Sequence, residues 1–155
     1  MAKLSMMCGY PRSGKSTWIK KNKGTRLVIE PDWVRREILG HTFHQPAEPI
    51  IWLIADSFIR VCLSQNQDVI LDGINLQPFI RSKYIHLAQS LDCKIECIWV
   101  DTPIDECIRR NEESDINNKL PTSILIGKQS VFVTPKLEEG FSSITIIHTG
   151  ETCKK

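Results

Sequence analysis

The string with the clearest chemistry in this chain of 155 residues lies near its start. It fits the pattern G-x-x-x-x-G-K-[ST], in which backbone N–H groups close around phosphate oxygens. In such a loop the lysine reaches the β- and γ-phosphates, and the hydroxyl that follows it ligates Mg²⁺. Here these side chains belong to Lys15 and Ser16. The predicted nucleotide-binding residues are Gly9, Tyr10, Pro11, Arg12, Ser13, Gly14, Lys15, Ser16 and Thr17.

The surroundings of this string separate it from a chance turn rich in glycine and lysine. The apolar run Leu4–Cys8 precedes it and predicts a buried strand, and a helix is expected from about Lys15 to Lys21. The motif requires a strand before it and a helix after it, and the positive end of that helix favours an anion. We therefore predict binding of ATP or GTP. ATP is favoured because the chain has no guanine-reading N-K-x-D string.

Three aspartates, Asp32, Asp72 and Asp101, follow predicted strands. In open α/β sheets, ligands bind beyond the carboxyl ends of the strands. Asp32 and Arg35 share one helix face, which suits a kinase whose carboxylate accepts a hydroxyl proton while the guanidinium holds an anionic acceptor. The alternative is an N-cap aspartate beside a surface arginine. Asp72 suits either an acid that orients the Mg²⁺ water shell or an Asp-Gly turn, and Asp101 is expected to begin a turn.

Strands and helices alternate along the chain. Strands are expected at 4–8, 26–30, 68–71, 94–100 and 144–148, and helices at 15–21, 32–39, 48–65, 78–91, 103–112 and 121–131. This alternation predicts βαβ units, and hence an α/β fold with a parallel sheet covered on both faces. The polar segment Gly40–Pro46, with His41 and His44, is predicted to be a surface loop.

Composition narrows the function classes. The length suits one domain over residues 1–155. The net charge of +2 comes from mixed acids and bases, so a nucleic-acid partner is possible but not supported by charge. No apolar run reaches the roughly 18–20 residues that span a bilayer, which predicts a soluble protein without a membrane partner. The cysteines form no C-x-x-C pair, which favours reduced thiols in the cytoplasm.

The strings G-Y-P-R-S-G-K-S-T at 9–17, D-W-V-R at 32–35 and V-I-L-D-G-I-N-L-Q-P at 69–78 together carry a family resemblance. The chain resembles small P-loop kinases of the zeta-toxin and polynucleotide 5′-kinase type, and most of all the kinase domain of phage polynucleotide kinase/phosphatase. R-R-N at 109–111 and P-K-L-E-E-G-F at 135–141 extend the likeness over roughly the whole chain. The resemblance implies a five-stranded parallel sheet of order 2-3-1-4-5. It also implies that Asp32 is the general base on the acceptor hydroxyl and that Arg35 engages the acceptor's phosphate.

The predicted lid, about residues 111–121, departs from this family. The family usually carries a lid arginine a few residues beyond the R-N pair, where it stabilises the transferring phosphoryl group. Here that place falls in the acidic run E-E-S-D at 112–115. Arg110 is our first choice as a substitute, and its alternative role is a surface pair with Glu106. The other nearby cations are Arg109, Lys119 and Lys128.

A second departure is Arg12, which stands where the family often has glycine and either reaches the terminal phosphate or points to solvent. An acidic lid also fits a polyanionic acceptor poorly. We expect an ATP- and Mg²⁺-dependent kinase whose acceptor is a polynucleotide 5′-hydroxyl, a nucleotide or a small metabolite. The alternative is an ATP-binding protein with little transfer activity because the lid arginine is missing. An adenylate-kinase-type function is disfavoured by the short acidic lid and the D-x-x-R string.

Overall fold

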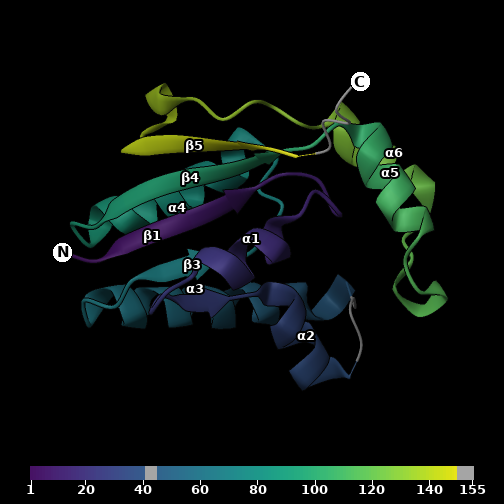
Figure 1. The fold of residues 1–155 in the computed structure, drawn as a ribbon. Helices are drawn as coiled ribbons and strands as arrows, with labels where there is room; N and C mark the ends of the chain where they lie inside the picture. The colour runs from purple at the N-terminus through teal and green to yellow at the C-terminus, as the bar shows by residue number, and fades with distance from the viewer. Residues whose placement is uncertain (41–44, 150–155) are drawn as a thin grey trace.

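The computed structural model describes residues 1–40 and 45–149 (Figure 1), so the predicted loop around His41 and His44 falls largely outside the described residues. The strands are β1 (Lys3–Cys8), β2 (Leu27–Ile29), β3 (Val69–Leu71), β4 (Lys94–Asp101) and β5 (Ser143–His148). They form one parallel sheet in the order β2-β3-β1-β4-β5. The predicted α/β class and the strand order implied by the resemblance are both confirmed.

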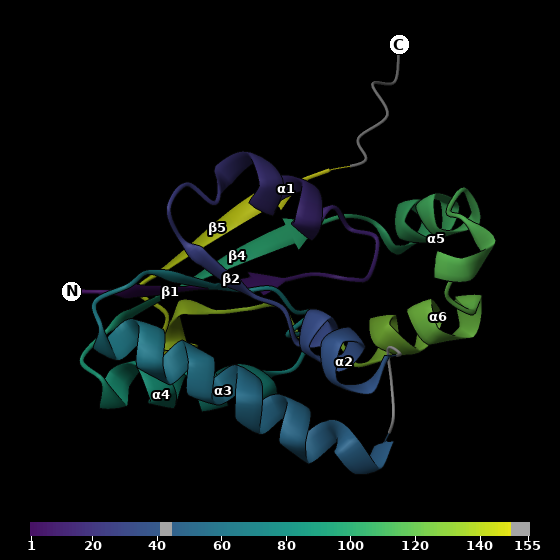
Figure 2. The ribbon, with the colours of Figure 1, turned by 90° about the horizontal axis from the view of Figure 1, so that it is seen from below.

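The helices lie where the sequence pattern predicts them, within a few residues at each end. They are α1 (Lys15–Asn22), α2 (Pro31–Leu39), α3 (Glu48–Ser64), α4 (Pro78–Ser90), α5 (Ile104–Glu112) and α6 (Thr122–Ser130). Short 3₁₀ turns are η1 (Gln45–Ala47), η2 (Ile116–Asn118) and η3 (Leu137–Glu139). Figure 2 shows α1 on one face of the sheet and α3 and α4 on the other. Helices α5 and α6 stand beyond the carboxyl ends of the strands (Figure 1).

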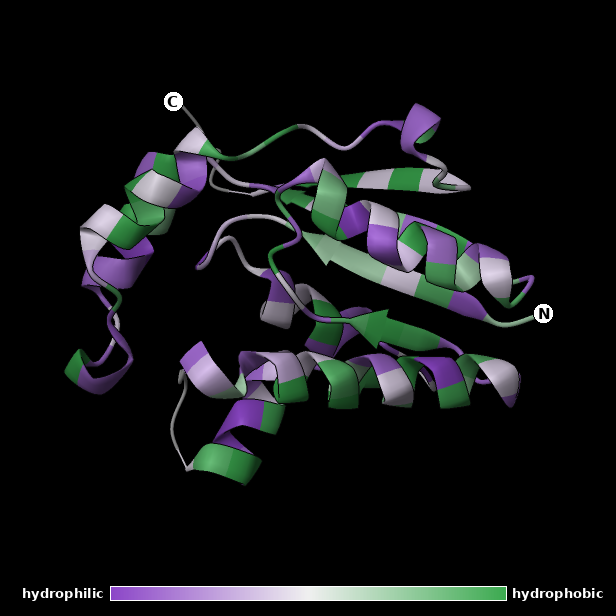
Figure 3. Ribbon diagram, turned by 180° about the vertical axis from the view of Figure 1, so that it is seen from behind, coloured by the Kyte–Doolittle hydropathy of each residue, from purple (hydrophilic) through white to green (hydrophobic). Residues whose placement is uncertain are grey.

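Successive residues of β1 enter different cores, because side chains alternate between the two faces of a strand. Leu4 and Met6 belong to the cluster under α3 and α4, which includes Ile59 and Tyr84. Met7 belongs to the smaller cluster on the side of α1. A strand that is covered on both faces has a nearly continuous apolar sequence. Figure 3 shows hydrophobic residues along the central strands. In the described part of the chain, no helix has both the length and the apolar character needed to cross a membrane.

The start of α2 differs from the prediction that Asp32 is its N-cap. Glu30 occupies the N-cap position and Pro31 is the first helical residue. Proline suits that position because its fixed φ matches the helix and no partner is needed for an N–H that it lacks. Asp32 therefore lies inside the first turn, where its carboxylate forms an ion pair with Arg35. The N-cap interpretation of Asp32 is wrong, and its carboxylate makes no capping bond.

Candidate active site

The predicted phosphate loop connects β1 to α1, and its backbone takes conformations that most side chains disfavour. Gly9, Arg12 and Gly14 have φ angles of 145°, 67° and 108°. A Cβ atom at Gly9 would lie 2.7 Å from the carbonyl oxygen of Val100, so only glycine fits there. Gly14 is the N-cap of α1, whose first N–H groups lack partners within the helix. The loop therefore presents backbone donors and a helix N-terminus to an anion.

Lys15 is the cation held inside this loop. Its side chain is buried, and Nζ donates to the carbonyl oxygens of Gly9 at 3.0 Å and Tyr10 at 2.7 Å. Burial lowers the pKa of Lys15, and the charge of Asp72 opposes that change. Charge-assisted bonds to phosphate are stronger than bonds to neutral carbonyls. Lys15 is thus positioned to exchange its two carbonyl partners for phosphate oxygens.

A cavity of about 680 Å³ opens beside the loop, a volume typical of small-ligand sites. Its lining combines two kinds of group. Cations and hydroxyls suited to phosphate and metal are contributed by Arg12, Lys15, Ser16, Thr17 and Arg110. Apolar surface suited to a nucleoside is contributed by Trp18, Val100 and Ile147. The cavity has the chemistry of a site for a nucleoside triphosphate.

Asp72 follows β3 at the carboxyl edge of the sheet. Its backbone N–H donates to the carbonyl oxygen of Ile29 at 2.9 Å, which extends the pairing of β3 with β2 by one bond. Burial raises the pKa of Asp72 to about 6, the charge of Lys15 lowers it, and the charges of Glu30 and Asp32 raise it. A carboxylate of this kind is destabilised until a cation arrives. The third aspartate, Asp101, ends β4, and its carboxylate lies 3.2 Å from Nδ1 of His148.

Arg35 is buried on α2 between two carboxylates. Its guanidinium pairs with the exposed Asp32 and binds Glu48 through two hydrogen bonds, from Nε to Oε1 and from Nη2 to Oε2, each 2.7 Å. The bond to Glu48 raises the pKa of Arg35 and lowers that of Glu48. The guanidinium also lies 5.6 Å from the centroid of the Trp52 ring. Sequence reasoning missed Glu48, whose only signal was an acid in the first turn of a predicted helix.

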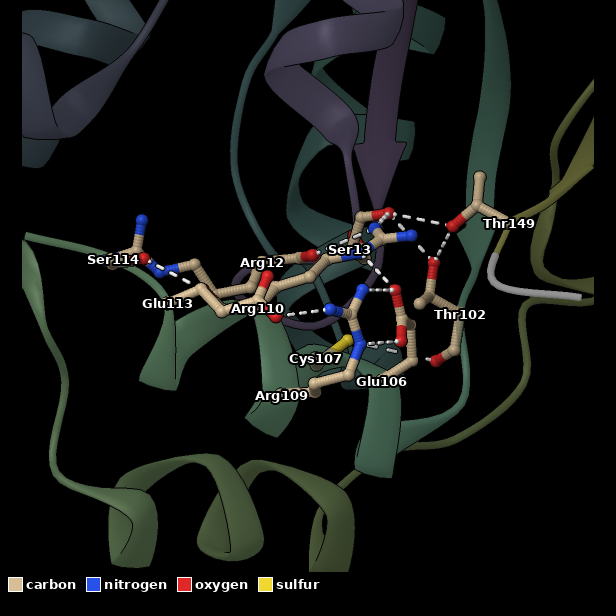
Figure 4. A network of polar contacts seen from close by, with 10 residues as sticks. All are labelled: Arg12, Ser13, Thr102, Glu106, Cys107, Arg109, Arg110, Glu113, Ser114 and Thr149. Carbon is tan, nitrogen blue, oxygen red and sulfur yellow. Dashed lines mark hydrogen bonds and ion pairs between the residues drawn. The ribbon is translucent and has the colours of Figure 1, made fainter. Parts of the chain in front are cut away.

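Arg110 on α5 reaches the phosphate loop. Its Nη1 donates to the carbonyl oxygens of Arg12 at 3.2 Å and Ser13 at 3.0 Å (Figure 4). Its Nε donates to Glu106 at 2.7 Å, so the pair considered as the alternative role is present as well. Arg109 binds the same carboxylate, and the two arginines lower the pKa of Glu106 to about 2. Arg110 therefore joins α5 to the loop while a carboxylate compensates its charge.

Two threonines that sequence reasoning missed also hold the loop (Figure 4). The hydroxyl of Thr102 donates to the carbonyl oxygen of Ser13 at 2.8 Å, and that of Thr149 donates to the same oxygen at 3.1 Å. Thr102 follows β4 and Thr149 follows β5. Their position just after adjacent strands was the one sequence signal available, because parallel strands end at the same edge. With Arg110, they give the Ser13 carbonyl three donors and fix this side of the loop.

A buried arginine stabilises the end of β1, the strand that leads into the phosphate loop. Arg81 is fully buried; it binds both oxygens of Glu139 at 2.8 Å and donates to the carbonyl oxygens of Asn75 and Val133. The Asn75 side chain in turn donates to the carbonyl oxygen of Met7 at 2.7 Å. The string at 69–78, through Asn75, and the string at 135–141, through Glu139, therefore meet at Arg81. This network fixes the end of β1, where the phosphate loop begins.

Arg12 extends from the loop to the predicted lid. Its Nε donates to Oδ1 of Asn111 at 3.4 Å, and its Nη2 donates to the carbonyl oxygen of Asn118. Asn111 is buried and also binds the backbone of Leu120 through both its oxygen and its nitrogen. The Arg12 side chain thus lies between the loop and the connection from α5 to α6, along the cavity.

A magnesium ion fits the donors near the loop. Within residues 1–40 and 45–149, no group of three or more His, Cys, Asp and Glu side chains is arranged to hold a metal by itself. Mg²⁺ does not need such a group, because it usually keeps several waters and takes one or two carboxylates plus substrate phosphates. Ser16 offers an exposed hydroxyl and Asp72 a carboxylate with a raised pKa. These oxygens suit an ion that arrives with a nucleotide.

Comparison with known proteins places this geometry among related folds. A family profile described as an AAA domain matches residues 4–123. A chain of the Pnkp1/Rnl/Hen1 RNA repair complex is 21% identical with a TM-score of 0.75, and the match covers 83% of this chain and 43% of that one. A second chain from a Pnkp1/Rnl/Hen1 complex is covered to 38%. This chain therefore spans about two fifths of the length of those proteins.

Two further structures match over nearly the whole chain. A putative kinase from Chloroflexus aurantiacus is 13% identical with a TM-score of 0.76, and the match covers 96% of this chain and 85% of that one. The Mycobacterium tuberculosis APS kinase CysC, solved with AMPPNP and APS, is 15% identical with a TM-score of 0.65, and 94% and 88% of the two chains are covered. At these identities the matches establish the fold, and they confirm the predicted resemblance to P-loop kinases.

Proposed function

The chain belongs to the family of AAA domains whose profile matches residues 4–123, and we propose that it is an ATP- and Mg²⁺-dependent kinase that transfers the γ-phosphoryl group to a hydroxyl acceptor. The observation that supports the proposal is a phosphate loop with a buried lysine in a chain whose next helix, α2, carries the paired Asp32 and Arg35. Burial lowers the pKa of Lys15 and raises that of Asp72, and the charge of Asp32 also acts on both groups, which supports a shared electrostatic environment at this edge of the sheet. A nucleotide site and an acid at the same edge of the sheet are what transfer to a hydroxyl requires.

Each residue has a defined part in the proposed reaction. Lys15 binds the β- and γ-phosphates, and Ser16 and Asp72 hold Mg²⁺, which neutralises charge on the phosphate oxygens when it is bound. Asp32, whose carboxylate is exposed, accepts the proton of the acceptor hydroxyl. The hydroxyl oxygen forms its bond to the γ-phosphorus as the bond to ADP breaks, and ADP leaves with the electron pair. Arg35 positions the acceptor. Arg110 holds the phosphate loop from α5 through its bonds to the carbonyl oxygens of Arg12 and Ser13.

The charges around Arg35 support a small, uncharged acceptor over a polynucleotide. Asp32 and Glu48 together outweigh the charge of Arg35, and Glu48 occupies two of its donors. An anionic acceptor meets a net negative charge at Asp32, Arg35 and Glu48, whereas a neutral hydroxyl compound does not have to overcome that repulsion. The acidic residues 112–115 of the proposed lid (about 111–121) add negative charge. We place the reaction in the cytoplasm, which agrees with the free thiols of the five described cysteines.

A phosphate-transfer screen tests the proposal. Labelled ATP and Mg²⁺ are incubated with the protein and three acceptor sets: neutral polyols and nucleosides, nucleotides, and 5′-hydroxyl oligonucleotides. We expect label on a hydroxyl compound, first among the neutral set. Tight ATP binding with no labelled acceptor in any set, and no acceptor-dependent ADP release, would reject the kinase.

The second candidate is an ATP-binding protein with little transfer activity. The observation that favours it is the pairing of cations on α5 and in the proposed lid with acids. Arg109 pairs with Glu106 and Glu113, and Lys119 pairs with Glu112. These cations are neutralised before a phosphoryl group arrives. The same screen separates the candidates, because this one predicts ATP binding without acceptor-dependent turnover.

A further inference from the structure

Arg12 combines an unusual backbone with an unusual environment. It is one of four non-glycine residues in the described part of the chain with positive φ, and it lies within the phosphate loop. At its φ of 67°, a glycine would adopt the same conformation without steric strain. The loop geometry therefore does not explain an arginine at this position. An explanation must come from its side chain.

The partners of the nearby cations set Arg12 apart. On α5 and in the proposed lid, Arg109, Arg110 and Lys119 each form an ion pair with a glutamate. Arg12 forms no ion pair with any described residue, and its two bonded partners are the uncharged oxygens of Asn111 and Asn118. Such partners orient a guanidinium without cancelling its charge. Arg12 thus keeps its full positive charge where the neighbouring cations are neutralised.

The side chain is also held at the right place for an anion. Arg12 lines the same cavity as Lys15 and Ser16. A guanidinium has five N–H donors, of which Asn111 and Asn118 take two. Three remain for phosphate oxygens. Because Asn111 and Asn118 belong to the lid side of the cavity, they fix the guanidinium between loop and lid.

We propose that Arg12 replaces the missing lid arginine and binds the transferring phosphoryl group, an inference that rests on the proposed kinase function. Arg12 donates hydrogen bonds to the non-bridging oxygens of the γ-phosphate as the acceptor oxygen forms its bond and ADP departs, and it neither gains nor loses a proton. Arg110, with its charge compensated by Glu106, positions the loop. The charge of Arg12 acts most strongly where negative charge develops in the transition state.

Titration calorimetry of the full chain tests this role without knowledge of the acceptor. The probes are MgADP alone and MgADP with aluminium fluoride, which mimics the transferring phosphoryl group. The variant is Arg12→Gly, because glycine relaxes the backbone at this φ and keeps the loop conformation. We expect MgADP affinity to change by less than about 3-fold and affinity for the aluminium fluoride complex to fall about 100-fold or more, in line with phosphoryl-transfer arginines.

Two further variants complete the test. Lys20→Ala removes one exposed positive charge from α1 outside the cavity, and it should leave both affinities within about 2-fold if only local charge matters. Arg12→Lys keeps the charge without the planar fork, and it should retain part of the affinity for the aluminium fluoride complex. Thermal unfolding of each variant establishes that it is folded.

The outcomes separate this inference from the function on which it rests. Wild-type protein that fails to bind MgADP rejects the proposed kinase, and the role of Arg12 with it. Normal wild-type binding with equal losses for both probes in Arg12→Gly assigns Arg12 to ground-state binding and overturns the inference alone. The inference is also overturned if Arg12→Gly binds both probes as tightly as the wild type. The same holds if Arg12→Lys binds the aluminium fluoride complex no more tightly than Arg12→Gly does.

Discussion

The substitution Asp72→Asn tests the idea that this carboxylate is held for a cation. Burial raises the pKa of Asp72 from 3.8 to about 6, and this value already includes the opposing attraction of Lys15. About two pKa units at 1.36 kcal/mol each correspond to about 3 kcal/mol. Asp72 is only half-buried, so solvent screening reduces this figure, and we expect ~1–2 kcal/mol.

The sign follows from proton binding. The native carboxyl binds its proton more tightly than the unfolded one, so its contribution to the free energy of unfolding falls between about pH 4 and pH 6 and then levels off. Asparagine does not ionise. Without nucleotide, Asp72→Asn should therefore be more stable than wild type by ~1–2 kcal/mol at pH 8 and by much less at pH 4.5.

Urea unfolding at both pH values measures this difference, and a second series adds saturating MgATP. With MgATP the order should reverse, because the ligand stabilises the wild type by more when Asp72 helps to hold Mg²⁺. A stability difference of the same size at pH 4.5 and pH 8 would refute the charge argument. An equal gain from MgATP in both proteins would refute the metal role.

Three other substitutions address the remaining parts of the site. Lys15→Ala should abolish tight ATP binding in calorimetry while the circular dichroism spectrum stays native, because the loop loses the cation that reaches the β- and γ-phosphates. Asp32→Asn should leave ATP affinity nearly unchanged and lower transfer by roughly 10²–10⁴-fold, measured with the acceptor found in the screen; normal turnover would exclude the base. Arg110→Ala should weaken ATP binding and lower turnover about ten-fold, with little change in melting temperature, because two bonds to the loop carbonyls of Arg12 and Ser13 are lost. A fall in turnover with unchanged ATP affinity would assign Arg110 directly to the transition state.

The sequence predicted those parts of the molecule that depend on local patterns. The apolar run of β1, followed by glycines and Lys15, specifies a strand, an anion loop and a helix within about twenty residues. The helical period of α3 and the proline that opens α4 placed these two helices within a residue or two. The Asp32 N-cap was wrong because Pro31 is the stronger signal for the first helical position. An N-cap that is predicted from the aspartate alone does not take the preceding proline into account.

The contacts that sequence reasoning missed join residues far apart in the chain. Glu48 meets Arg35 from the next helix, and Thr149 meets Ser13 across 136 positions. No spacing rule links such pairs, since the sheet topology brings them together. The side chain of Arg12 illustrates the limit most clearly. The sequence predicted that this side chain points either towards phosphate or towards solvent. In the structure it points towards Asn111 and Asn118, whose oxygens accept its hydrogen bonds.

The Arg81 network bears on how the molecule unfolds. The family match ends at residue 123, yet Glu139, which binds the fully buried Arg81, lies beyond it. Removing one partner from a buried ion pair costs about 3–5 kcal/mol, a large share of a typical domain's stability of roughly 5–15 kcal/mol. The segment 4–123 therefore lacks the carboxylate that pairs with the buried Arg81. The C-terminal connection and the end of β1 belong to one cooperative unit, so hydrogen-bonded amide protons of both should exchange with solvent through the same opening event.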